Sequence, residues 1–495
     1  MSKLERLVGA VLMPEFRPAG GASPGAPKRL PSRAYLERFP PLGVIGFGRR
    51  LPDGKRIEGL REVTAELVKL ANRCSGVHPF VCADLECGAG YHMPGASLLP
   101  PARAMAAAES QRPGSVREAA KLTGFEARRA GIDLVLAPVL DVNTNPQNPI
   151  IGVRAFGTEV AEVIRHGREF LAGLADAGAG ACIKHYPGHG DTRTDSHLEL
   201  PRIDRDLPAL ERTELAPFHA LLSEFGGSDL LSVMVAHLDV PALTGVPGLP
   251  TTLSLKLLQR LRQAGFRGAA LTDGLAMKAV SEHPKLGTAC LLAGCDGLLA
   301  PVDEEAMAEE ILGSVASGEL PLERLEEAAG RMGLLRDSLL GQDDALSCGG
   351  DAKAIALASL SASEDFVVWK ERFSATPFLL KVTPGCEPLR DVLGTLGKSE
   401  SGPILIAASI QPCAGGGAGR LSEESVAAIR SAIAMGEERG RRLGFVWFGA
   451  DEALSRDEVA DLTRKLRALN APILIAFAPS DVMVDAVASL VKSPV

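Results

Sequence analysis

The chain has 495 residues, more than a single hydrophobic core usually supports, so we expect about two domains. Its formal net charge of −8, without any lysine- or arginine-rich run, excludes the electrostatic footprint of proteins that bind nucleic acid or anionic lipid. We therefore expect no nucleic-acid partner and no membrane partner. The apolar stretch near the N-terminus is too short for a signal peptide or a bilayer span, so we expect a cytoplasmic protein.

The cysteines are nine in number and form no C-x-x-C pair. Cys82, Cys182, Cys290 and Cys295 stand inside apolar stretches. This pattern predicts buried, reduced thiols rather than disulfides or a zinc site.

Short apolar runs alternate with amphipathic segments through most of the chain before residue 340. The segments between the runs carry helical spacing, and several of them end at a glycine. Eight strands separated by helices are typical of a (β/α)8 TIM-like barrel, with a doubly wound parallel sheet as the alternative. The predicted strands are Leu7–Met13, Gly43–Phe47, Pro79–Ala83, Leu134–Pro138, Ala179–Lys184, Leu230–Ala236, Gly268–Thr272 and Gly297–Ala300.

A helical segment over Leu320–Leu340 closes this first domain, which we place at residues 1–343, with a linker at 344–372. Residues 373–495 contain four more apolar runs that alternate with helical segments, and they predict a smaller α/β sandwich domain. The four runs are ATPFLLKV, PILIAAS, GFVWFGA and PILIAFA. The chain stops at KSPV, where another strand would begin, so we expect this second domain to be minimal or truncated.

Ionisable residues follow the predicted strands of the first domain. In a barrel enzyme the carboxyl ends of the strands and the loops after them hold the catalytic groups. One such residue alone could be a loop or capping residue, but charged residues after five strands together indicate an active site. These residues are Asp84, Asp141, Arg154, Lys184, His185, His237 and Asp273.

The loop KHYPGHGDTRTDSH, from Lys184 to His197, is the most specific feature of the sequence. It gathers histidines, a lysine, two aspartates and two glycines, and core packing does not require such a set. A metal site is one alternative, with His185, His189, Asp191 and His197 as ligands. The spacing does not match a hydrolytic zinc site, so we expect neither a metal nor an organic cofactor.

Asp195 and His197 are two residues apart, so in an extended backbone their side chains point to the same side and can hydrogen-bond. The carboxylate would then orient the imidazole, which can donate and accept a proton near neutral pH. No serine or cysteine stands at an obvious strand end beside a base, whereas Asp273 does, and this favours a carboxylate nucleophile. Carboxylate attack on an anomeric carbon is the chemistry of retaining glycosidases.

Six further segments of the first domain accompany this loop, in this order: ADLECGAG, LDVNTNPQNPIIGVRAFG, SVMVAHLDVPAL, LPTTLS, FRGAALTDGLAM and AGCDGLLAP. Together they resemble the family 3 glycoside hydrolases, specifically the β-N-acetylglucosaminidase (β-N-acetylhexosaminidase) branch. The resemblance covers roughly residues 4–340.

The resemblance implies a role for each matching position. Asp273 would form the glycosyl-enzyme intermediate, and His197, assisted by Asp195, would be the acid/base in place of a second carboxylate. The residues that would bind the hydroxyl and acetamido groups of the sugar are Asp84, Arg154, Lys184 and His185.

Two positions depart from the family pattern. Gly274 replaces the second aspartate of the usual Asp-Asp-Leu motif, and His92 stands where the family has a further sugar-binding arginine. We keep His92 among the substrate-binding candidates and expect activity with altered sugar contacts.

The resulting prediction is a retaining exo-β-N-acetylglucosaminidase that acts on small glycans, namely the muropeptides of peptidoglycan turnover or chitooligosaccharides. The chain's two tryptophans both fall outside the first domain, which favours a pocket for chain ends over a long polymer-binding surface. A β-glucosidase or β-xylosidase of the same family and an inactive sugar-binding barrel are the alternatives. Phosphorolysis beside hydrolysis also stays open, because a neutral His197 would let an anionic acceptor approach. The oligomeric state is not predicted.

Overall fold

The structure is a computed structural model. It describes residues 1–18, 28–48, 60–93, 96–194, 196, 199–342 and 350–361. In the C-terminal part it describes 379–382, 404–409, 423–438, 443–448 and 473–475, with a few isolated positions. The chain divides into two compact units. Unit 1 comprises Met1–Ser97, Ala120–Val142 and Val163–Gly349, and unit 2 comprises Leu98–Ala119, Asn143–Glu162 and Gly350–Val495.

Unit 1 is built around parallel strands. Seven of them pair in chain order from β2 to β8, and β1 pairs separately with β9, with Leu12 opposite Leu298. A parallel bridge between Leu271 and Gly297 joins β8 to the residue before β9. The strands are β1 (Leu12–Met13), β2 (Glu15–Phe16), β3 (Gly43–Gly46), β4 (Phe80–Ala83), β5 (Leu134–Val135), β6 (Gly180–Tyr186), β7 (Leu231–Val235), β8 (Ala270–Thr272) and β9 (Leu298–Leu299).

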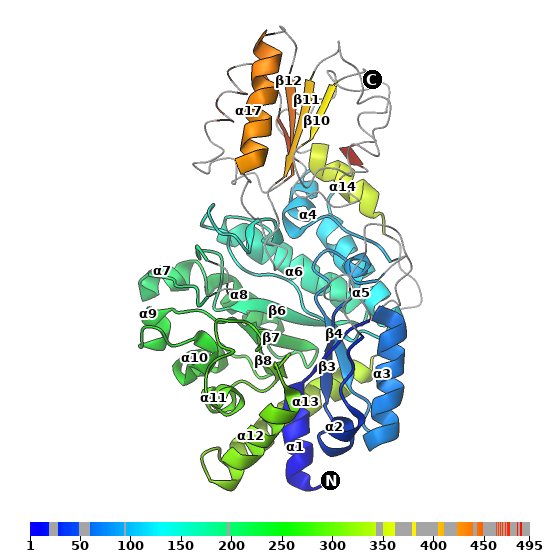
Figure 1. The fold of residues 1–495 in the computed structure, drawn as a ribbon, viewed down its shortest axis with the longest axis vertical. Helices are drawn as coiled ribbons and strands as arrows, with labels where there is room; N and C mark the ends of the chain where they lie inside the picture. Colours follow the sequence, from blue (N-terminus) through cyan, green and yellow to red (C-terminus); the bar gives the residue numbers. More distant parts are fainter. Residues whose placement is uncertain are drawn as a thin grey trace. The chain divides into compact units, whose positions relative to one another are not determined.

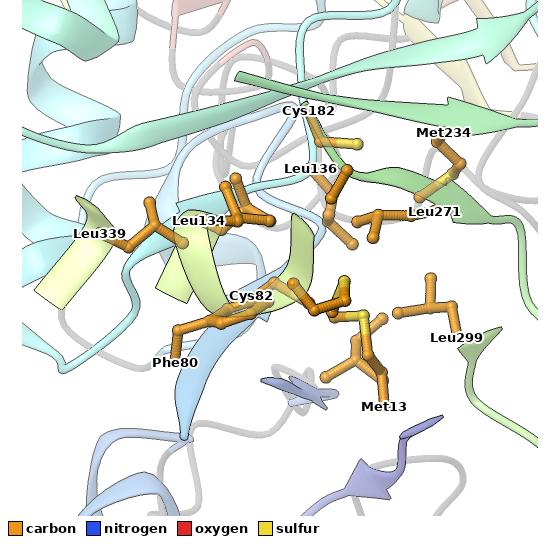
Figure 2. Packing of buried hydrophobic residues seen from close by; sticks show 14 of the residues in the cluster. Met13, Phe80, Cys82, Leu134, Leu136, Cys182, Met234, Leu271, Leu299 and Leu339 are labelled. Carbon is orange, nitrogen blue, oxygen red and sulfur yellow. The ribbon is translucent and has the colours of Figure 1, made fainter. Parts of the chain in front are cut away.

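The sheet is curled around a core to which strands along its whole length contribute. Figure 2 shows Met13 of β1, Cys82 of β4, Cys182 of β6, Leu271 of β8 and Leu299 of β9 gathered in one cluster. Side chains from so many strands can meet only if the sheet bends back on itself. Each large apolar side chain that is fully buried here contributes roughly 1.5–3 kcal/mol of transfer free energy.

Helices cover the outer side of these strands (Figure 1). The pairs α1 and α13, α1 and α12, α11 and α12, and α10 and α11 are in contact. The helices of unit 1 are α1 (Lys3–Val11), α2 (Arg33–Arg38), α3 (Leu60–Ser75), η1 (Ala89–Tyr91), α7 (Leu207–Arg212), α8 (Ala216–Phe225), α9 (Pro241–Thr244), η3 (Thr251–Leu253), α10 (Leu255–Gln263), α11 (Leu286–Ala293), α12 (Glu304–Ala316) and α13 (Leu322–Leu340). Two helices, α5 (Ser115–Arg129) and α6 (Val160–Asp176), run from one unit into the other.

The prediction of a strand over Leu7–Met13 is wrong for its first five residues. Those residues lie in α1, and only Leu12 and Met13 form a strand. Ser2 accepts a hydrogen bond from the amide of Glu5, while the Glu5 side chain accepts one from the amide of Ser2. This reciprocal capping box starts a helix, and it outweighs the β-propensity of the apolar run that follows.

Six of the other seven predicted strands contain an observed strand, and the prediction for Ala179–Lys184 overlaps β6, which continues to Tyr186. The short strand β2, Glu15–Phe16, was not predicted. Cys82, Cys182, Cys290 and Cys295 are buried free thiols, as predicted. None of the helices that the structure describes is both long enough and apolar enough to span a bilayer.

A buried ion cluster lies at the amino ends of strands β8 and β9. Asp296 is fully buried just before β9, and its carboxylate accepts hydrogen bonds from Arg262 (2.6 Å), Arg324 (2.9 Å) and Arg331 (3.1 Å). It also accepts from the amide of Ala270 at 3.0 Å, at the start of β8.

We expect Asp296→Ala to lower the free energy of unfolding by about 3–5 kcal/mol, because three guanidinium groups would lose the carboxylate that they share. Glu327→Gln is the control: Glu327 pairs with Arg324 and Arg331 but is half exposed, so a loss of about 1 kcal/mol or less is expected. Urea unfolding monitored by circular dichroism measures both values, and equal losses would show that burial of Asp296 is not what matters.

Unit 2 contains a second, four-stranded parallel sheet in the order β10-β11-β12-β13, with α17 packed against β10 and β11 (Figure 1). Three of the four strands lie inside apolar runs predicted for the C-terminal domain, and β12 begins one residue before its run. The described elements are α4 (Ala102–Ala108), η2 (Gly152–Arg154), α14 (Ala352–Ser361), β10 (Leu379–Val382), β11 (Ile404–Ser409), α17 (Glu423–Glu438), β12 (Leu443–Phe448) and β13 (Ile473–Ile475).

Candidate active site

Polar side chains gather at the carboxyl ends of the strands of unit 1. Asp84 directly follows β4, Lys184 and His185 lie near the end of β6, and Asp273 directly follows β8. Because the strands are parallel, their carboxyl ends share one edge of the sheet. The ion pairs and electrostatic couplings between these residues confirm that they lie close together.

Lys184 is the cation at the centre of this edge. Its side chain is almost fully buried, and its Nζ lies 2.7 Å from Oδ1 of Asp84 and 2.6 Å from Oε1 of Glu86. A buried ammonium is stable only when it is paired with opposite charge, and two carboxylates supply that charge here. Sequence reasoning gave Glu86 no role, and no spacing rule links it to a lysine 98 positions later in the sequence.

An irregularity in β6 shapes the position of the next side chain. Ile183 pairs with Val233 and Tyr186 with Val235, so Lys184 and His185 together stand opposite one residue of β7. In a regular strand two consecutive side chains face opposite sides of the sheet, and a bulge re-aims one of them. The ring of His185 points its Nδ1 at Oδ2 of Asp141, 2.7 Å away, in the loop after β5.

Asp273 lies partly buried among positive groups. Desolvation raises the pKa of its carboxyl, but the charges of His185, His237 and Lys184 and a hydrogen bond from Gly274 outweigh that effect. The pKa of Asp273 therefore lies below its ordinary value, and the group is a carboxylate at neutral pH. The amide of Gly274 donates to Oδ1 at 2.8 Å and fixes the orientation of the carboxylate.

His237, at the end of β7, supports the turn that follows Asp273. Its Nε2 donates to the carbonyl oxygen of Gly274 at 3.2 Å, and its Nδ1 lies 2.9 Å from Oγ1 of Thr252. The sequence placed His237 on the catalytic edge but gave it no role. Its contacts indicate that it holds the backbone beside Asp273.

The loop after β6 is anchored through His189. This histidine is buried, its Nδ1 lies 2.8 Å from Oγ1 of Thr192, and its Nε2 lies 3.3 Å from Oγ of Ser196. Burial lowers the pKa of His189 to about 4, although the charges of Asp141 and Asp273 oppose that shift. His189 is therefore neutral near pH 7, and its ring connects the hydroxyls of Thr192 and Ser196. The ring lies close enough to Asp273 for its pKa to respond to that charge.

Two glycines let this loop pack closely. A Cβ on Gly190 would lie 1.8 Å from the carbonyl oxygen of Val142, and one on Gly188, whose φ is +127°, would lie 2.8 Å from Cβ of Glu214. Arg205 forms ion pairs with both Glu214 (2.7 Å) and Asp191 of this loop (3.3 Å). Close packing requires a glycine at both positions, and at Gly188 the positive φ requires it as well.

The lowered pKa of His189 makes a prediction about acid stability. The unfolded chain takes up a proton on this ring below its ordinary pKa of about 6.5, whereas the folded protein does so only near pH 4, so stability falls as the pH drops through this window. Between pH values of about 7 and 5, His189 alone accounts for about 2 kcal/mol. We expect His189→Gln to lose that much less stability than the wild type in urea unfolding at the two pH values, and an equal loss would contradict the assignment.

The profile of the Glycosyl hydrolase family 3 N terminal domain matches residues 39–335, which is more than half of the chain. The chain belongs to glycosyl hydrolase family 3. It is therefore a glycoside hydrolase, as the sequence predicted.

Two relatives of similar sequence carry the name "Beta-hexosaminidase". A "Beta-hexosaminidase" of Thiobacillus denitrificans is 33% identical over 284 residues, which are 54% of this chain and 74% of the relative. One from Xanthomonas oryzae pv. oryzae is 33% identical over 322 residues, covering 63% of this chain and 91% of the relative. A solved family 3 β-N-acetylglucosaminidase from Paenibacillus sp. is 26% identical, with a TM-score of 0.73 over 99% of this chain and 97% of its own.

The predicted acid/base pair of this family 3 chain, Asp195 and His197, lies outside the described residues. Its assignment stays a prediction. Ser196, which stands between the two in the sequence, is described, and it is buried against His189.

Two predicted sugar-binding residues also stay predictions. Arg154 belongs to unit 2, at the end of η2, where its Nη1 donates to the carbonyl oxygen of Ile150 at 3.1 Å. His92 is buried, with Nδ1 2.6 Å from the carbonyl oxygen of Gly48, and burial lowers its pKa although the charge of Asp84 opposes this. The contact with Gly48 shows at least one structural task for His92.

The other departure from the family pattern, Gly274 in place of the usual second aspartate, is not imposed by packing. A Cβ on Gly274 would meet only the Met277 side chain, at 3.7 Å, which is an ordinary contact distance. There is therefore space for a Cβ at this position. Within the part of the chain that the structure describes, no three histidine, cysteine or acidic side chains are grouped so that they could hold a metal ion.

Proposed function

We propose that this protein is a retaining exo-β-N-acetylglucosaminidase that removes terminal β-linked N-acetylglucosamine from small glycans. The single observation that carries the proposal is the position of the Asp273 carboxylate, directly after β8 at the edge of the sheet that also holds Lys184 and His185, with its Oδ1 bound by the amide of Gly274. Gly274 binds Oδ1, which leaves Oδ2 to attack the anomeric carbon and form the glycosyl ester. The nearby positive charges keep the nucleophile deprotonated when it acts.

The architecture that we propose for this chemistry is a (β/α)8 barrel in residues 1–343, a linker at 344–372 and a C-terminal α/β sandwich domain at 373–495. The pairing of β1 with β9 and the bridge from Leu271 to Gly297 support closure of the curled sheet. The contribution of Met13, Leu271 and Leu299 to one core supports it too.

The acid/base in this proposal is His197, oriented by Asp195. Ser196, between them in the sequence, hydrogen-bonds His189, and the pKa of His189 responds to the charge of Asp273. This chain of contacts supports a loop attachment close to the nucleophile. His197 would protonate the leaving oxygen in the first step and take a proton from water in the second.

The sugar specificity in the proposal comes from several lines. The hexosaminidase name of the relatives and the β-N-acetylglucosaminidase title of the Paenibacillus structure support N-acetylglucosamine as the sugar. We assign Asp84 and Lys184 to its hydroxyls, and His185, Arg154 and His92 to further contacts. As substrates we propose muropeptides of peptidoglycan turnover or chitooligosaccharides, in the cytoplasm.

The His197 assignment predicts a dependence on the leaving group. In His197→Ala, we expect kcat/KM for glycosides with poor, strongly basic leaving groups to fall by about 10²- to 10⁴-fold, because their departing oxygen needs a proton. Aryl glycosides with acidic leaving groups should lose far less in the bond-breaking step. A series of aryl β-N-acetylglucosaminides measures this trend, with Arg193→Ala in the same loop as the control. An equal loss across the series would assign the acid elsewhere.

Substrate panels separate the alternatives. Activity on aryl β-N-acetylglucosaminides but not on β-glucosides or β-xylosides supports the proposal, and the reverse preference supports the other branches of the family. Formation of a sugar 1-phosphate only when phosphate is added would assign phosphorolysis. A folded protein without turnover of any glycoside would indicate an inactive sugar-binding barrel.

A further inference from the structure

Asp141 is a buried carboxylate beside the candidate site that the proposed chemistry does not use. It has no exposed surface, and it lies in the loop between β5 and α6. Its two oxygens have separate partners. Oδ1 accepts hydrogen bonds from the backbone amides of His189 (2.7 Å) and His185 (3.3 Å), and Oδ2 lies 2.7 Å from Nδ1 of the His185 ring.

This division fixes which way the carboxylate faces. The two amides can only donate, so they hold Oδ1 in place, and Oδ2 is then directed at the ring. The pKa of Asp141 is lowered: burial raises it, but the charge and hydrogen bond of His185 and the charge of His189 outweigh that. The group is therefore an acceptor only, and the nitrogen that faces it must carry a proton.

We propose that Asp141 is a positioning residue that keeps a proton on Nδ1 of the His185 ring, so that Nε2 is the nitrogen that gives up its proton and then presents a lone pair to a hydroxyl of the bound sugar. The second half of this inference rests on the proposed function, whereas the tautomer does not. The arrangement has the logic of the buried aspartate that orients the histidine of a hydrolytic triad, used here for binding instead of proton transfer. An acceptor at Nε2 selects a hydroxyl and disfavours an aglycone or a sugar that offers no donor at that place.

Asp141→Asn tests the proposal because the backbone amides of His185 and His189 also fix the orientation of the new side-chain amide. Only the oxygen of the new amide group can accept from the backbone of His185 and His189, so its NH₂ must face Nδ1 of the ring. Nδ1 then has to become the acceptor, and the proton moves to Nε2. Water cannot relieve this constraint at a fully buried position.

Nitrogen NMR of the full chain labelled at histidine reads the tautomer directly. In spectra recorded with rising pH until the ring nitrogen signals stop shifting, we expect wild-type His185 to carry its remaining proton on Nδ1 and Asp141→Asn to carry it on Nε2. His185→Asn assigns the signal. Asp133→Asn is the matched control. Asp133 is a buried carboxylate directly before β5, the strand that Asp141 follows, and it accepts hydrogen bonds from the amide of Val81 and from Arg128. This substitution should leave the His185 signals unchanged.

The wild-type spectrum alone can overturn the inference, even if Asp141→Asn does not fold, because a proton on Nε2 of the neutral wild-type ring contradicts it. An unchanged tautomer in a folded Asp141→Asn also contradicts it. In the enzyme assay we expect Asp141→Asn to lower kcat/KM for aryl β-N-acetylglucosaminide by about ten- to a hundredfold, because Nε2–H no longer accepts. The expected tautomer in a wild type that turns over no glycoside would leave the inference intact and remove the proposed function.

Discussion

Asp273→Asn is expected to lower kcat by about four to six orders of magnitude, the size of effect seen when a covalent nucleophile is removed. The amide keeps the shape of the side chain and the hydrogen bond from Gly274 but cannot form the glycosyl ester. Hydrolysis of an aryl β-N-acetylglucosaminide by purified protein measures the loss. Asp239→Asn is the control: Asp239 is also buried after a strand of the sheet, but it binds Arg202 and the amide of Gly248, so kcat should stay within about tenfold.

Anion rescue sharpens this prediction. In Asp273→Gly, added azide can occupy the vacated space and displace the leaving group of a β-glycoside once, which gives the α-glycosyl azide. In His197→Ala, azide would attack the glycosyl-Asp273 ester instead, and two displacements give the β-glycosyl azide. Product stereochemistry by NMR therefore distinguishes the two roles, and a β-azide from Asp273→Gly would contradict the assignment of the nucleophile.

The second large effect is expected for Lys184→Met. Removal of the ammonium leaves the carboxylates of Asp84 and Glu86 facing each other in a mostly buried site without a countercharge. We expect kcat/KM to fall by about 10²- to 10³-fold and the free energy of unfolding to fall by about 3 kcal/mol. The reason is that two neighbouring carboxylates without a countercharge repel each other, which favours their protonated forms and destabilises the folded protein. Kinetics and urea unfolding of the same preparation give both numbers.

Lys3→Met is the matched control for that change. Lys3 makes an equally short ion pair, 2.6 Å with Glu326, but its side chain is 78% exposed, so we expect a change in stability of less than about 1 kcal/mol and no change in activity. Wild-type kinetics in Lys184→Met would show that this lysine neither binds the sugar nor keeps Asp84 in place.

Local patterns predicted the strands well, because seven of the eight apolar runs in the first domain are flanked by glycines or by amphipathic segments of clear helical spacing. The run Leu7–Met13 is ambiguous by composition, and the Ser2–Glu5 capping box, which is visible in the sequence, decides for a helix. Strand order and curling depend on pairings between distant residues, such as Leu12 with Leu298, that no local pattern contains.

The candidate site was predictable to the level of the edge where it lies. Parallel strands bring Asp84, Lys184 and Asp273 to one edge, and strand-end positions can be counted in the sequence. The partners that set their chemistry could not be predicted. Two such contacts are the ion pair of Lys184 with Glu86 and the hydrogen bond of His185 with Asp141. They depend on the bulge in β6 and on the paths of the loops, which are set by packing and not by local propensity.

A mechanism-based trap can capture the covalent intermediate on the protein. A 5-fluoro N-acetylglucosaminyl fluoride reacts quickly in the first step because fluoride leaves well, while its ring fluorine slows release of the ester. We expect the intact protein to gain the mass of one fluorinated sugar and the labelled peptide to carry the modification on Asp273. Turnover of the reagent without any labelled protein, or a label on another residue, would contradict this expectation.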